Sequence, residues 1–231
     1  MQRLFTTLKA RAGFDRAAFR NAALDRHAPQ LSNAHPMISG LIVNLVDVDP
    51  GDAQWVRPGE TPEPTDDPVY DVIFEVLAPG SQLAGIAAAI DVMLASSAEA
   101  IHHYIETPMP ARVNRERPAG AGRSPGVKYI VLCRFKPDLP DAAAQRCWQH
   151  HVPLALKVHI GADIYIRHWV DRRLTSDAPI VQGITELHFP TWDDMRYRWF
   201  ASDEARQQII QDIGHFLDSG TRLYCSEYVL K

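Results

Sequence analysis

Four of the ten histidines of the chain lie within one short stretch, and imidazole is the side chain here best suited to chemistry. They are His150, His151, His159 and His168. An imidazole changes protonation near neutral pH without special tuning, so each could accept or donate a proton during a reaction. His150 and His151 are adjacent on a predicted helix and point about 100° apart, so only one of them can face a given cavity.

The strands predicted after this helix divide the other candidates between two faces. Successive side chains of a regular strand alternate, so Tyr165 and His168 are expected on opposite sides of theirs. Glu186 and His188 share a face of the next predicted strand. A carboxylate in the middle of a sheet needs a partner. Glu186 is therefore expected to orient His151 or His168, to act as a base itself, or to occupy a solvated edge position or a structural ion pair.

The amino-acid composition limits the classes of protein to which this chain can belong. Hydrophobic residues make up 46% of the 231 residues and the net charge is −4, which is ordinary for a globular protein and lacks the basic footprint of a nucleic-acid binder. No apolar run approaches the ~18–20 residues of a membrane helix. The N-terminus is unlike a signal peptide, so the cytoplasm is the expected location. Cys133, Cys147 and Cys225 lack paired spacing and are interpreted as reduced thiols, with no zinc site.

The first half of the chain alternates strand-like and helix-like patterns. Strands are predicted at 3–9, 38–46, 70–77 and 111–117, and helices at 15–30, 81–94 and 96–106. Asp15 is the expected N-cap of the first helix, and Pro29 lies near its end. A proline-rich acidic loop over 48–68 contains Trp55, which is interpreted either as a lid residue or as a side chain that anchors its own loop. His102 and His103 are placed on a surface helix.

After a glycine- and proline-rich linker at 117–126 the same order recurs. Strands are predicted at 128–135, 164–170, 184–189 and 223–230. A helix opens at Asp138 and Asp141 and stops at Gly161, and a second helical region follows Thr191 to Leu217 with a break at 201–202. Each half thus has the strand–helix–strand–strand–helix–strand order of a ferredoxin-like unit. The predicted domains are 1–116 and 127–231.

Short segments of the two halves align with one another. His27-Ala-Pro matches His151-Val-Pro, Asn44-Leu-Val-Asp matches His168-Trp-Val-Asp, and a strand containing Glu75 matches one containing Glu186. The match favours His151 over His150 and makes His27, Asn44 and Glu75 secondary candidates for ligand binding. Two such units can pack sheet to sheet and enclose a cavity within one chain.

At these residues the chain resembles the EthD family of dimeric α+β barrel proteins. The similarity lies in Trp148-x-x-His151-x-Pro153-Leu, in Tyr165-x-x-His168, in the strand around Glu186 and in the helix break after Phe200. The family usually has Asn where His168 stands. The resemblance implies two ferredoxin-like units joined as an intramolecular dimeric α+β barrel. Its members include isomerases, dehydratases and decarboxylases.

The first hypothesis is therefore a cofactor-independent lyase, isomerase or dehydratase acting on a small cyclic or aromatic metabolite. Its catalytic residues would be His151, His168, Tyr165 and Glu186, with Trp148, His188, His27, Asn44, Glu75 and Trp55 around the substrate. The second hypothesis is a non-catalytic small-molecule-binding protein. The third is a heme protein, because barrels of similar length include chlorite dismutases. Neither a nucleic acid nor a membrane is an expected partner, and further homodimerisation is left open.

Overall fold

Helices and strands follow one another in nearly the same order in the two halves of the chain. The computed structural model describes residues 2–48, 68–115 and 121–231. The first half contains β1 (Arg3–Ala10), α1 (Arg16–Ala22), a π-helical turn η1 (Ala23–His27), α2 (Ala28–Ala34), β2 (Gly40–Asp47), β3 (Val72–Leu77), α3 (Gly80–Leu94) and β4 (Ala98–Val113). The second contains β5 (Gly122–Arg123), β6 (Val127–Phe135), α4 (Asp141–Val158), β7 (Ile164–Arg173), β8 (Gly183–Phe189), α5 (Trp192–Tyr197), α6 (Asp203–Ile213) and β9 (Leu217–Val229).

In the described ranges, eight strands close into one antiparallel barrel in the order β2-β3-β1-β4-β7-β8-β6-β9, and β2 pairs with β9 to complete the circle. The two halves meet edge to edge, through β4 with β7 and β2 with β9. Closure leaves these strands no open edge for another chain to pair with. The expected α+β barrel is present: the two sheets join along their edges, and side chains from both pack against one another in its interior.

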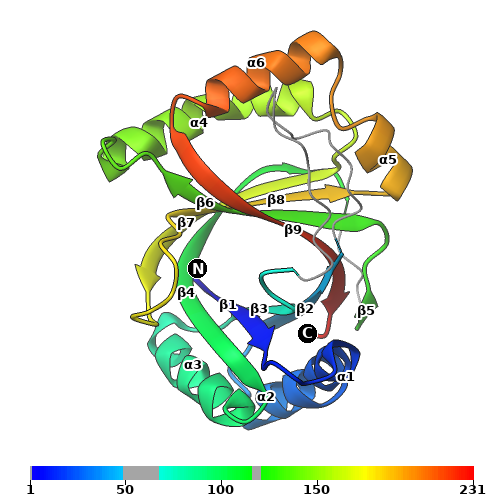
Figure 1. The fold of residues 1–231 in the computed structure, drawn as a ribbon, viewed down its shortest axis with the longest axis vertical. Coiled ribbons are helices and arrows are strands. Elements are labelled where there is room, and N and C mark those ends of the chain that lie inside the picture. Colours follow the sequence, from blue (N-terminus) through cyan, green and yellow to red (C-terminus); the bar gives the residue numbers. More distant parts are fainter. Residues whose placement is uncertain (1, 49–67, 116–120) are drawn as a thin grey trace.

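The helices cover the outside of the barrel in two groups (Figure 1). Helices α1 to α3 pack on the strands of the first half, and α4 to α6 on those of the second. Because side chains alternate along a strand, each strand presents one set to the helices and the other to the barrel interior. On β1, Leu4 and Leu8 pack toward the helices, whereas Phe5 joins Tyr104 and Ile130 in a separate interior cluster.

The barrel interior also contains a buried ion network. Its permanent cations are Arg3 and Lys128, and four buried carboxylates face them: Glu75, Glu106, Glu186 and Glu227. Arg3 lies 2.9 Å from Glu75 and 3.4 Å from Glu186, and Lys128 lies 3.2 Å from Glu186 and 3.1 Å from Glu227. Asn44 donates a hydrogen bond of 2.7 Å to Glu75. Carboxylates outnumber permanent cations in this network, so it favours one more positive charge.

His168 is placed to supply that charge. Its Nδ1 lies 2.9 Å from Glu106 and its Nε2 lies 3.0 Å from Glu186. Burial and the neighbouring Arg3 lower the pKa of His168, but Glu186 and Glu106 outweigh them, so its pKa lies above the ordinary value. Burial raises the pKa of the Glu186 carboxyl, but Lys128 and His168 hold it well below its usual range. The two carboxylates therefore favour the imidazolium form of His168 in the folded protein.

Several expectations from the sequence were wrong in detail. The segment 96–106, predicted as a helix, is the first part of β4, because its register with β1 outweighs the local helix preference of an Ala- and Ser-rich segment. His103 is consequently buried, 2.8 Å from Thr6 and 3.0 Å from Asp91, and does not lie on a surface helix. Pro29 does not end the first helical region, because it occupies the first turn of α2, where proline is tolerated.

Other expectations were confirmed or fall outside the described ranges. Asp15 caps α1 by accepting from the amide of Ala17 at 2.8 Å. Cys133 and Cys225 are buried free thiols. Within the predicted linker, Gly122 and Arg123 pair with β9, whereas Trp55 and most of the 48–68 loop lie outside the described residues. None of the described helices is both long and apolar enough to cross a membrane.

We expect His168→Asn to lower the free energy of unfolding by about 3–5 kcal/mol near pH 6, because it removes a buried positive charge between two carboxylates. The folded pKa of His168 lies above 6.5, so its stabilisation is complete below about pH 6.5 and is lost as the pH rises through the raised value. The difference in unfolding free energy between wild type and variant, measured in urea, should therefore shrink from about pH 6 to about pH 9.

His150→Asn, at an exposed position of α4, is the matched control and should change little. A difference that stays constant over this range would mean that His168 is neutral in the folded protein.

Candidate active site

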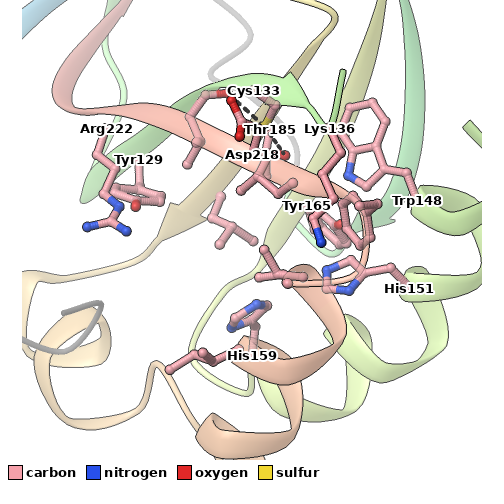
Figure 2. A pocket seen from close by; sticks show the side chains of 17 residues that line it. Tyr129, Cys133, Lys136, Trp148, His151, His159, Tyr165, Thr185, Asp218 and Arg222 are labelled. Atoms are coloured by element: carbon pink, nitrogen blue, oxygen red, sulfur yellow. Dashed lines mark hydrogen bonds between the residues drawn. The ribbon is translucent and has the colours of Figure 1, made fainter. Parts of the chain in front are cut away.

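A cavity of about 520 Å³ lies in the second half, between the outer face of the sheet and helices α4 and α6 (Figure 2). It is outside the barrel, on the opposite side of the sheet from the expected position between two sheets. The expectation was wrong because the ion network and its apolar neighbours fill the interior. The cavity is lined by Tyr129, Val131, Cys133, Lys136, Trp148, His151, His159, Tyr165, Thr185, Leu187, Ile210, Ile213, Gly214, Phe216, Leu217, Asp218 and Arg222.

Helix α4 positions two of the predicted residues in this cavity. Trp148, His151, Ala155 and Val158 are all buried and are spaced three or four residues apart, so they form one stripe of the helix facing the sheet. His150 falls on the exposed face, as expected from the 100° turn per residue. The Trp148 ring packs so closely on Gly183 of β8 that a Cβ there would lie 2.6 Å from it.

His151 forms a pair with Asp212 of α6, a residue that the sequence analysis did not single out. Its Nδ1 lies 2.6 Å from the Asp212 carboxylate, and the imidazole is 5% exposed whereas the carboxylate is 37% exposed. Burial lowers the pKa of His151, and Asp212 opposes this in part, so the ring is neutral at neutral pH. With Nδ1–H donated to Asp212, the lone pair lies on Nε2, which has no hydrogen-bond partner among the described residues.

His159 is a second imidazole in the same cavity. Its Nδ1 lies 3.4 Å from the carbonyl of Trp199, and complete burial lowers the pKa of His159 to about 3. This histidine is neutral at any ordinary pH and is a hydrogen-bond acceptor through its other nitrogen. His159 belongs to the histidine-rich stretch but was not among the predicted site residues. Its position one residue after the end of α4, just before Gly161, was the available signal.

Strand β7 supplies the phenol of the site. Tyr165, Arg167 and Trp169 project to the helix side, and His168 to the barrel interior, as the alternation predicted. Burial raises the pKa of Tyr165, so its hydroxyl remains a donor. Arg167 stacks 5.4 Å from the Trp148 ring centre and donates to the Trp148 carbonyl at 2.9 Å, which fixes the wall beside His151.

The structure therefore separates the predicted site residues into groups. Trp148, His151 and Tyr165 meet in the cavity. His168, Glu186, His188, Asn44 and Glu75 lie on the other side of the sheet, in the barrel interior. Glu186 contacts His168 and His188 and does not orient His151, because the sheet separates them. His27 is buried in η1 of the first half, and its Nε2 lies 3.0 Å from Nη2 of Arg26.

The described residues also carry no group of three or more His, Cys, Asp or Glu side chains arranged to hold a metal ion.

Known proteins resemble this chain in overall structure and in one segment of its sequence. No curated protein sequence matches the chain. An anthrone oxidase-like protein has a similar structure, with a TM-score of 0.60 and 11% identity over 100% of this chain and 91% of that one. A candidate monooxygenase from Lactobacillus acidophilus NCFM has a TM-score of 0.52 at 10% identity, over 100% and 95% of the two chains.

A candidate chlorite dismutase has a TM-score of 0.51 at 10% identity, over 100% of this chain and 94% of that one. At such identities the likeness is one of fold alone. Residues 136–220, which contain most of the cavity, match the family model of the EthD domain. The predicted resemblance to the EthD family is thus confirmed for residues 136–220.

Proposed function

We propose that the protein is an enzyme that moves a proton on a small, mainly apolar ring compound bound in the cavity of the second half. The observation that carries the proposal is the His151–Asp212 pair at 2.6 Å. It leaves a neutral imidazole with a free lone pair facing a cavity walled by aliphatic and aromatic side chains. A base of this kind, oriented by a carboxylate, is a common arrangement for abstracting a proton.

The proposed step is abstraction of a proton from a carbon next to a carbonyl. Nε2 of His151 takes the proton, and the electron pair of the broken C–H bond moves into the carbonyl to form an enolate. Asp212 stabilises the imidazolium that results, and the Tyr165 hydroxyl donates to the enolate oxygen. Return of the proton to another carbon completes an isomerisation. Alternatively, the enolate electron pair forms a C=C bond while a leaving group departs from the adjacent carbon with the proton of the His151 imidazolium, which completes a dehydration or another elimination.

All three similar structures bear names that refer to enzymes: an anthrone oxidase, a monooxygenase and a chlorite dismutase. Anthrone, in the name of one of them, is a ring ketone whose acidic C–H bonds lie across the ring from the carbonyl and are conjugated with it through the aromatic rings, so loss of a proton there also places negative charge on the carbonyl oxygen. The likeness to these proteins is one of fold, so the proposal stands on the side chains of the cavity.

We also propose that the two halves are related ferredoxin-like units and that only the second is catalytic. In the pairing of β1 with β3, Arg3 lies opposite Leu77, and in the pairing of β6 with β8, Lys128 lies opposite His188. When these two strand pairs are aligned, Glu75 corresponds to Glu186 and Phe74 corresponds to Thr185. The same register puts Leu41 at the position of Tyr165. Large apolar side chains thus stand in the first half where the second half has its cavity-lining hydroxyls, and they join a packed core.

Heme is the alternative occupant of this cavity. The site fits it in one respect, because His151 and His159 are neutral imidazoles, the donor type that heme iron takes in many proteins. His151 would hold the iron through Nε2, with Asp212 on its other nitrogen. Such iron would supply redox chemistry, for which the proposed proton transfer has no need.

The first prediction concerns His151 itself. With 2-tetralone, a bicyclic ketone, as the probe, the protein should speed exchange of the protons next to the carbonyl in D₂O, followed by NMR. His151→Gln should reduce this exchange by about 10²–10⁴-fold, because it removes the base. His150→Gln, on the exposed face of the same helix, should leave it unchanged. Full exchange activity in a folded His151→Gln variant would show that His151 is not the base.

The second prediction concerns Asp212. The base is active when neutral, so kcat/KM for exchange should rise with pH through a pKa below the ordinary value for histidine. Asp212→Asn removes the group that raises this pKa, so the rising limb should move to lower pH while the plateau falls. A limb that stays in place would mean that Asp212 serves only the packing of α6.

The third prediction separates the proposal from its alternatives. The protein as purified should show no Soret band, and heme added to it should not produce a stable one. A Soret band that is lost in His151→Gln would replace the proton-transfer proposal by a heme site. A purely binding protein would instead bind 2-tetralone without accelerating its exchange, in wild type and in His151→Gln alike.

A further inference from the structure

We infer that the substrate is an anionic ring compound whose carboxylate is bound by Arg222, at the end of the cavity away from His151. The inference rests on the proposed site and names the class of molecule that it takes. It follows from where charge is present on the cavity wall and where it is absent.

The inner wall of the cavity carries no charge. Burial lowers the pKa of both histidines, His151 and His159, and raises the pKa of the Cys133 thiol to about 12 and that of Tyr165 further. All four groups are therefore neutral near pH 7. An ionised group placed among them would lose its hydration without gaining a counter-charge, so the body of the ligand must be uncharged.

Charge is confined to three lining residues, Lys136, Asp218 and Arg222. The negative charge of Asp218 is already matched, because Arg134 lies 3.4 Å from its carboxylate. Within the described ranges, neither Lys136 nor Arg222 forms an ion pair. Two unmatched cations thus border an otherwise neutral cavity, and this combination favours a ligand with an apolar body and an anionic substituent.

The two cations lie toward different ends of the cavity (Figure 2). Lys136 lies on the side of Trp148 and His151, and Arg222 lies on the other side, beside Tyr129. A carboxylate bound by Arg222 would leave the rest of the ring compound to extend toward His151. Lys136 would then face the end where the proposed step develops negative charge on oxygen. Arginine also suits the anchoring role, because its planar fork can bind both carboxylate oxygens at once.

Two probes of the same shape test this inference without any need for turnover. They are 2-naphthoate, which carries a carboxylate, and 2-naphthalenemethanol, which is neutral; both are titrated by calorimetry at low ionic strength. The wild-type protein should bind the carboxylate about 10-fold more tightly than the alcohol, which is a typical gain for a charge-assisted contact at a partly exposed site. Arg222→Gln should abolish that preference and leave affinity for the alcohol unchanged.

Arg146→Gln is the matched control, because it removes one exposed cation of α4 that does not line the cavity. It should keep the preference, and so should His151→Gln, because the anchor lies away from the base. Equal affinity for the two probes, no binding of either, or a preference that survives Arg222→Gln would overturn the inference. If Lys136→Gln lost the preference for the carboxylate and Arg222→Gln kept it, Lys136 and not Arg222 would be the residue that binds the carboxylate.

These outcomes are separate from the fate of the proposed function. If naphthoate binding depends on Arg222 but His151→Gln still exchanges the 2-tetralone protons fully, the charge recognition holds and the role of His151 fails. If exchange depends on His151 but the two naphthalene probes bind equally, the role of His151 holds and the charge recognition by Arg222 fails.

Discussion

The pairing of every barrel strand on both of its edges is the constraint on which the rest of this structure depends. Backbone amides and carbonyls in a protein interior must be hydrogen-bonded, and closing the sheet through β2–β9 and β4–β7 satisfies them for all eight strands at once. Closure also assigns each side chain to the barrel interior or to the helix-covered exterior. Residues only three apart in sequence, such as Tyr165 and His168, therefore belong to different environments.

Burial has opposite consequences in these two environments. In the barrel interior, His168 is enclosed by Glu106 and Glu186, and their charges outweigh the cost of burying an imidazolium. In the cavity, His159 lies against aromatic rings and a backbone carbonyl, so burial prevails and the ring is neutral. Two equally buried histidines thus differ in charge because of their neighbours. The charged one takes part in the ion network, and the neutral one can accept a hydrogen bond through its second nitrogen.

In the proposed alignment of the two halves, corresponding strand positions carry similar side chains in the barrel interior and different ones on the helix side. Both present an acidic residue at the same register position of the barrel interior, as Glu75 and Glu186. On the helix side, the first half has Leu41 and Phe74 where the second has Tyr165 and Thr185. A phenylalanine fills the space that a threonine leaves open. Leu41 and Phe74 both belong to the packed core of the first half.

The sequence by itself determined the order of most elements, the caps and breaks of several helices, and which residues share a face of a strand. These features are local, because they depend on periodicity and on short-range hydrogen bonds. It also identified His151, Trp148 and Tyr165, which meet in the cavity. The strand structure of 96–106 could not be predicted from local pattern, because its pairing partner β1 lies about 100 residues away in the sequence.

Only the tertiary structure decided which face of the sheet bears the cavity. It placed His168, Glu186 and His188 in the barrel interior and brought Asp212 to His151 across 61 positions of sequence. Whether a buried carboxylate is a catalytic base or a member of an ion network depends on the charges around it. Those charges come from β1, β4 and β6, and the closure of the barrel brings them together.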